Sequence, residues 1–196
     1  MVRIEDGKVS GRSSKSSSPL RRLAFVTLGQ SPRIDLVPEL LAELDMPIDA
    51  LEYGLLDDID ADRLLEAGPV DREASFLTRL RDGSYIELSV AWTHTRFLEV
   101  YDNIKAQGAD LVVLMSASCG HDFKPDGATV LSDRVVDRAI EVMANADLRV
   151  GVVVPLKALR DGIHILGGPW MIEEPQAAKP GDFAGLARAL SKMTDC

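Results

Sequence analysis

One short segment of the sequence concentrates hydroxyl, thiol and imidazole side chains, namely Ser116, Ser118, Cys119 and His121. A thiol beside backbone amides can be acidified, and Cys119 would then act as a base or a nucleophile. Ser116 and Ser118 would donate hydrogen bonds to an oxyanion or a carboxylate. The alternative interpretation is a buried, inert cysteine among turn-forming serines. Two candidate ligands are too few for a zinc site, so we predict neither a metal nor another cofactor.

A second polar segment follows an apolar run closer to the N-terminus. The run 23–28 ends in Gly29-Gln30-Ser31-Pro32-Arg33. Gly29 permits close backbone approach to a ligand, and amides at a helix start can donate to an anion. Gln30 and Ser31 add side-chain donors, while Arg33 can bind a carboxylate through two N–H groups. The alternative is structural, with Ser31 as a helix N-cap, Pro32 at the first helical position and Arg33 in solvent.

The elements that would position these two segments alternate between strands and helices. The pattern predicts strands at 23–28, 48–53, 110–115 and 149–154, helices at 60–66, 92–106, 132–144 and 183–193, one further helix that begins at Ser31-Pro32, and a hairpin at 76–88 that turns at Asp82-Gly83. This alternation predicts an α/β fold with a mostly parallel sheet and flanking helices. Ligands of such sheets bind beyond the carboxyl ends of the strands. We therefore expect the loops that begin at residues 29 and 116 to share one anion-sized hollow.

Composition along the chain predicts three parts. Residues 1–22 are rich in serine and basic side chains and predict a flexible extension, or alternatively a basic arm for an acidic partner. Residues 23–147 would form a first α/β lobe, and residues 148–196 a second lobe that is short or truncated. A truncated lobe would leave apolar surface uncovered, which favours a homo-oligomer.

Charge and cysteine content exclude several classes of protein. Acidic residues outnumber basic ones by 31 to 22, and the formal net charge of −9 argues against a nucleic-acid binder. The apolar runs are far shorter than the ~20 residues that cross a bilayer, so we predict no membrane partner. Two cysteines make no disulfide framework, which favours reduced thiols in the cytoplasm. The expected partner is a small carboxylate or another small anionic molecule.

Several segments together resemble the AroM family. They are Thr27–Leu36 with its Gly-Gln-Ser-Pro-Arg sequence, Thr78–Ser84, Gln107–Leu114 and Gly151–Pro155. The resemblance covers about 22–193 and implies a relation to the aspartate/glutamate/hydantoin racemases. That group has two similar α/β lobes with a carboxylate-sized cleft between them. Its racemases use two cysteines on opposite sides of the substrate carbon, one removing the α-proton and the other delivering a proton.

The chain departs from this pattern at both cysteines. The first family cysteine falls on Ser116 when counted forward from Asp110, and on Cys119 when counted back from Asp122-Phe123; we favour Cys119. The second would fall on Cys196, which no apolar strand precedes, so two-base racemisation is not predicted. The resemblance thus implies cysteine-assisted proton transfer on a small carboxylate, of the racemase, isomerase or decarboxylase class. The alternative is an inactive anion-binding protein that keeps the cleft but lacks the thiol pair.

Overall fold

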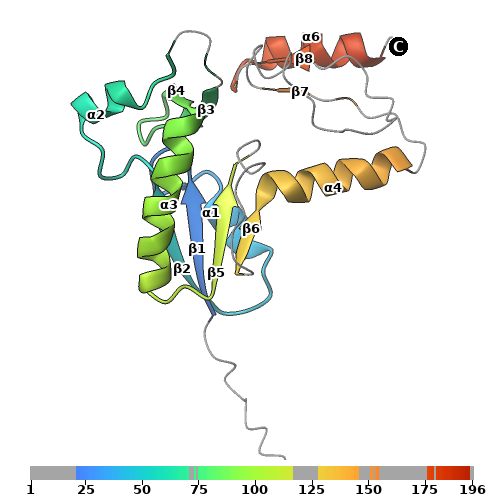
Figure 1. Ribbon diagram of the computed structural model, residues 1–196. Coiled ribbons are helices and arrows are strands. Elements are labelled where there is room, and N and C mark those ends of the chain that lie inside the picture. Colours follow the sequence, from blue (N-terminus) through green and yellow to red (C-terminus); the bar gives the residue numbers. More distant parts are fainter. Residues whose placement is uncertain are drawn as a thin grey trace, which may run out of the picture.

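The central element of the fold is a four-stranded parallel sheet (Figure 1). The computed structural model describes residues 21–70, 73, 75–116, 128–145, 151, 153–154, 176–178 and 180–194. The sheet order is β2 (Ile48–Gly54), β1 (Arg21–Thr27), β5 (Leu111–Met115) and β6 (Thr129–Leu131). All three neighbouring pairs run parallel. The predicted α/β class with a parallel sheet and flanking helices is therefore confirmed.

The main core lies between the sheet and α3 (Val90–Ala106). Alternate residues of the central strands, Ala24 and Val26 among them, are fully buried and share one cluster with Phe97 and Ile104 of α3. Phe25 is buried outside that cluster, as expected for a residue that points to the opposite face of a strand. Figure 1 shows α3 in front of the sheet and the short α1 (Val37–Ala42) behind it.

The predicted hairpin is present beside the amino-terminal end of α3. It consists of β3 (Ser75–Arg79) and β4 (Tyr85–Ser89), which pair antiparallel. Gly83 in its turn has a φ of 90°, a conformation that glycine adopts without steric cost. The predicted helix before it is α2 (Ala61–Glu66), and the Asp60 side chain caps it by accepting from the Arg63 amide. The Asp82-Gly83 signature was therefore sufficient to predict the turn.

The helix predicted to begin at Ser31-Pro32 was placed wrongly. The helix begins at Val37 with Pro38 in its first turn, and the Ser31–Pro32 peptide bond is cis. The Ser31 hydroxyl donates to Asp57 and so caps no helix. Both the N-cap interpretation of Ser31 and the helical interpretation of Arg33 are therefore wrong. The strand β6 was not predicted, because three residues are too few to show a period.

The C-terminal part is described only in short pieces. Its elements are β7 (Val153–Val154), which pairs parallel with β8 (Gln176–Ala177), and α6 (Phe183–Thr194). The predicted helix at 183–193 is confirmed, and the predicted strand at 149–154 is seen at its end as β7. The division into lobes at residues 147 and 148, like the extension at 1–22, stays a prediction.

Two of the described helices each carry at least three apolar side chains in solvent. The helices are α4 (Ser132–Asn145) and α6, and the exposed residues are Val135, Val136, Val142, Met143, Phe183, Leu186 and Leu190. The predicted homo-oligomer is not tested by this exposure and stays a prediction. Among the described residues, no helix combines the length and the apolar content needed to traverse a bilayer.

Candidate functional site

The two polar segments singled out in the sequence leave the sheet at one edge. Strands β1 and β5 are neighbours, and their last residues, Thr27 and Met115, are register partners. The strands run parallel, so the Gly29–Arg33 loop and Ser116 both follow the carboxyl ends of adjacent strands. The two segments therefore reach a common edge, whereas the anion-sized hollow predicted between them stays a prediction. Ser118 and Cys119 lie outside the described residues.

Ser116 is held at the end of β5 by the first residue of α4. The Ser116 amide donates to the Ser132 Oγ atom at 2.9 Å. The same hydroxyl lies 2.7 Å from the carbonyl oxygens of Leu114 and Ser116 and donates its proton to them. The backbone of Ser116 is therefore fixed by α4.

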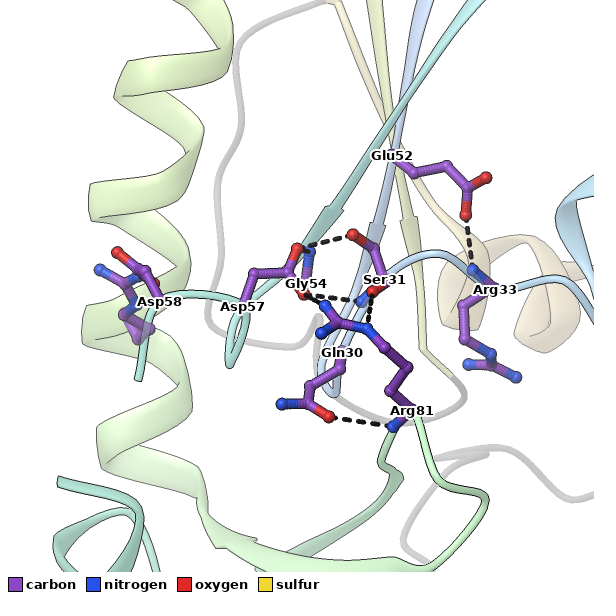
Figure 2. Close-up of polar contacts among 9 residues, drawn as sticks. Gln30, Ser31, Arg33, Glu52, Gly54, Asp57, Asp58 and Arg81 are labelled. Atoms are coloured by element: carbon purple, nitrogen blue, oxygen red, sulfur yellow. Dashed lines mark hydrogen bonds and ion pairs between the residues drawn. The ribbon is translucent and has the colours of Figure 1, made fainter. Parts of the chain in front are cut away.

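The Asp57 carboxylate accepts several hydrogen bonds that hold the Gly29–Arg33 loop in place (Figure 2). Asp57 follows β2 closely, and its two oxygens accept from the Ser31 amide at 2.8 Å, the Ser31 hydroxyl at 2.6 Å and the Gly54 amide at 2.7 Å. Arg81 donates a fourth hydrogen bond through Nη2 at 3.2 Å. Two of the donors that the sequence suggested for a substrate carboxylate, both from Ser31, are thus used within the chain.

Arg81 ties the hairpin to the same loop. Its amide donates to the Gln30 Oε1 atom at 2.9 Å, and its Nε donates to the Ser31 carbonyl at 2.8 Å. The Gln30 amide in turn donates to the Arg79 carbonyl at 3.4 Å. The loop after β1 is therefore clamped between the end of β2 and the hairpin, and Gln30 keeps its side-chain NH₂ without a partner among the described residues.

Two glycines allow this close approach. A Cβ atom on Gly29 would collide with the Arg79 carbonyl and lie 2.8 Å from the Thr78 Oγ1 atom. A Cβ atom on Gly54 would lie 2.5 Å from the Gly29 carbonyl oxygen. The freedom predicted for Gly29 is therefore used for packing of loop against hairpin, and no ligand needs to be invoked for it.

Arg33 lies apart from the Asp57 cluster, as Figure 2 shows. Its Nε and Nη2 atoms donate to the two oxygens of Asp35 at 2.8 and 3.0 Å, and Nη1 donates to Thr27 Oγ1 at 3.2 Å. The Arg33 amide donates to Glu52 at 2.6 Å. A guanidinium has five N–H groups, so two of them have no partner within the described part of the chain. Arg33 can therefore still receive an anion at the end of β1.

The Arg33–Asp35 pair is charged at neutral pH. The hydrogen bonds from Arg33, with a smaller contribution from the charge of the neighbouring Arg79, lower the pKa of Asp35 to about 2. The same hydrogen bond raises the pKa of Arg33. Asp35 thus holds the guanidinium in a fixed orientation.

Sequence reasoning missed the residues that organise this edge. Asp57 and Arg81 were not singled out, although Asp57 follows a predicted strand and the carboxyl-end rule applied there as well. No such signal existed for Arg81 or Glu52. Within the described ranges, no three potential metal ligands among His, Cys, Asp and Glu gather at one point.

Comparison with known proteins agrees with the resemblance found in the sequence. A profile of the AroM protein family matches residues 23–168. The match includes the four-stranded sheet except for Arg21 and Arg22, and it also includes the hairpin, the Gly29–Arg33 loop and Ser116. No curated protein and no solved structure matches the chain significantly. Because the profile spans most of its length, the chain belongs to the AroM family.

Proposed function

We propose that this AroM-family chain binds a small carboxylate at the carboxyl edge of its sheet and acts on it by cysteine-assisted proton transfer. The observation that carries the proposal is the register of β1 and β5, which brings the Arg33 loop and Ser116 to one edge. Arg33 would hold the carboxylate with its two unused N–H groups. The reaction would be a racemisation, isomerisation or decarboxylation.

The proton-transfer role belongs to Cys119 in this proposal. Cys119 follows Ser116 by three positions, and three extended residues span at most ~10 Å, so chain length alone keeps Cys119 within that reach of Ser116. The Cys119 thiolate would remove the proton next to the carboxylate, and the resulting thiol would return a proton to the carbanion; in a decarboxylation the thiol would instead protonate the carbon that loses CO2. Ser116 and Ser118 would donate to the enolate oxygen that develops, and Gln30 would help to anchor the substrate. Ser31 would contribute by holding the loop in place, since its hydroxyl donates a hydrogen bond to Asp57.

The experiment is hydrogen–deuterium exchange at the α-carbon of candidate substrates in heavy water, followed by NMR. Dicarboxylates and hydantoins form the first panel. We expect the wild-type chain to exchange at least one of them and Cys119→Ala to lose the exchange. Cys196→Ala is the matched control, because it removes the other cysteine of the chain and leaves the proposed site intact. Equal exchange by wild type and Cys119→Ala would refute the role of the thiol.

A second candidate function is binding without chemistry. The observation that favours it is that the carboxylates of the described edge are committed to structural partners, Asp35 to Arg33 and Asp57 to Ser31 and Arg81. Such a protein would be stabilised by a carboxylate, by ~2–3 kcal/mol near 100 times its dissociation constant, without any exchange. Thermal unfolding with each compound of the exchange panel separates the two functions.

A further inference from the structure

Two arginines from different elements meet at one aspartate beside the proposed site. Arg33 follows β1, and Arg79 is the last residue of β3 in the hairpin. Arg33 donates to both oxygens of Asp35, and the Arg79 Nη1 atom lies 3.4 Å from one of them. One carboxylate thus lies between two guanidinium groups, and the three side chains together carry a net charge of about +1 at neutral pH.

Arg79 has few partners for a guanidinium that is largely out of solvent. Its side chain is 30% exposed, and that of Arg33 is 18% exposed. Apart from the ion pair with Asp35, the Arg79 guanidinium makes no hydrogen bond to a described residue. Its Nη2 atom packs against the hairpin turn, 3.3 Å from where a Cβ atom on Gly83 would stand. A guanidinium removed from water in this way gains from any acceptor that reaches it.

The arrangement around the pair is fixed by the rest of the site. Asp35 has a pKa of about 2 and is ionised, so it attracts both arginines at neutral pH. The Arg79 carbonyl accepts from the Gln30 amide, which ties the hairpin strand to the loop that carries Arg33. Glu52 accepts a hydrogen bond from the backbone amide of Arg33 and not from its guanidinium, which keeps two N–H groups without a partner among the described residues. The two guanidinium groups are therefore presented on clamped segments.

We infer that Arg33 and Arg79 together form an oxyanion-binding pair, and that Arg79 anchors the ligand of this edge along with Arg33. The inference rests on the proposed function for the identity of the oxyanion, a carboxylate. The pair itself would receive any small oxyanion, inorganic phosphate included. Because Glu52 adds a negative charge nearby, affinity depends on the hydrogen bonds of the two arginines more than on net charge.

The test is calorimetric titration of the full-length chain with acetate, succinate and inorganic phosphate at low ionic strength. We expect a carboxylate to bind the wild type. Arg79→Gln should weaken binding about tenfold, the loss of one charge-assisted hydrogen bond, and Arg33→Gln should weaken it more, because it loses two. Arg138→Gln is the matched control, since Arg138 on α4 is 81% exposed and pairs with Glu141. It should bind like the wild type.

The outcomes separate this inference from the proposed function. If carboxylates bind and Arg33→Gln weakens them while Arg79→Gln does not, the pair is refuted and carboxylate binding stands. If phosphate alone binds, and both arginine variants weaken it, the pair stands and the carboxylate function is refuted. Binding of no probe refutes both. Should Arg79→Gln lose its native circular dichroism spectrum, Arg79→Met replaces it, because methionine keeps an unbranched side chain without the charge, and unchanged affinity in a folded Arg79→Met refutes the pair.

Discussion

Replacement of Asp57 by alanine should loosen the loop after β1. The side chain accepts hydrogen bonds from two backbone amides, one hydroxyl and Arg81. The carboxylate is 30% exposed, so water replaces part of what is lost. With ~1 kcal/mol for each of three hydrogen bonds and ~0.5 kcal/mol for the exposed ion pair, the loss is at most about 3.5 kcal/mol.

Urea unfolding at neutral pH measures this loss. Ser31→Ala removes one of the same bonds and should cost about 1 kcal/mol. The control is Asp45→Ala, because Asp45 is exposed and its removal changes the charge of the chain by the same amount. If Asp57→Ala and Asp45→Ala unfold at the same urea concentration, the four contacts contribute nothing and the account of this loop is wrong.

Formate provides a more specific version of the test. Truncation to alanine leaves the donors of Ser31, Gly54 and Arg81 around a space that a small carboxylate can enter. At ten times its dissociation constant, formate would stabilise the variant by about 1.4 kcal/mol. The wild type, whose own carboxylate fills the place, should show none of this gain. Equal stabilisation of both proteins would show that formate acts elsewhere.

Three further predictions concern packing, pH and the end of β5. Gly54→Ala should lower the free energy of unfolding by ~3 kcal/mol because its Cβ atom meets backbone atoms, while Gly68→Ala, with its nearest contact at 3.5 Å, should change it little; thermal unfolding compares them. Asp35 has a pKa of about 2, so its contribution to the free energy of unfolding is present above about pH 4 and is lost as the pH falls toward 2. Because this carboxylate is exposed, the contribution is at most ~1 kcal/mol. Urea unfolding from pH 6 to 2 should show this slope, and Asp35→Asn should lack it; parallel curves would contradict the assignment. Ser132→Ala should speed hydrogen exchange of the Ser116 amide about tenfold, and an unchanged rate would mean that water or another group holds that amide.

The sequence was sufficient for those parts of the fold that local patterns determine. Continuous apolar runs marked β1 and β5, and Asp82-Gly83 marked the hairpin turn. The start of α1 was misplaced because Ser31-Pro32 carries a valid local signal for a helix. The acceptor that takes the Ser31 hydroxyl lies 26 residues further along the chain, and no local pattern shows such a contact.

The position of the two segments at one edge of the sheet was predictable from the sequence, whereas the contacts of Ser31 and Arg33 were not, and the candidate site itself stays a prediction. The carboxyl-end rule brought Gly29 and Ser116 to one edge without any knowledge of the coordinates. The partners of Arg33 and Ser31 come from a neighbouring position, from β2 and from the hairpin. Charged residues such as Asp57 and Arg81 look like solvated loop residues in a sequence, and only the fold shows which of them meet.

The two segments at the carboxyl edge of the sheet are held by different elements, one by the hairpin and the other by α4. Gln30 and Ser31 are fastened to the hairpin by Arg81, whereas Ser116 is fastened by Ser132 to a helix on the other flank. A tilt of α4 would displace the tip of β5 and leave the arginine flank where it is. The distance between Ser116 and the Gly29–Arg33 loop therefore depends on the position of α4. Among the described residues, α4 makes no hydrogen bond to Gln30 or Ser31.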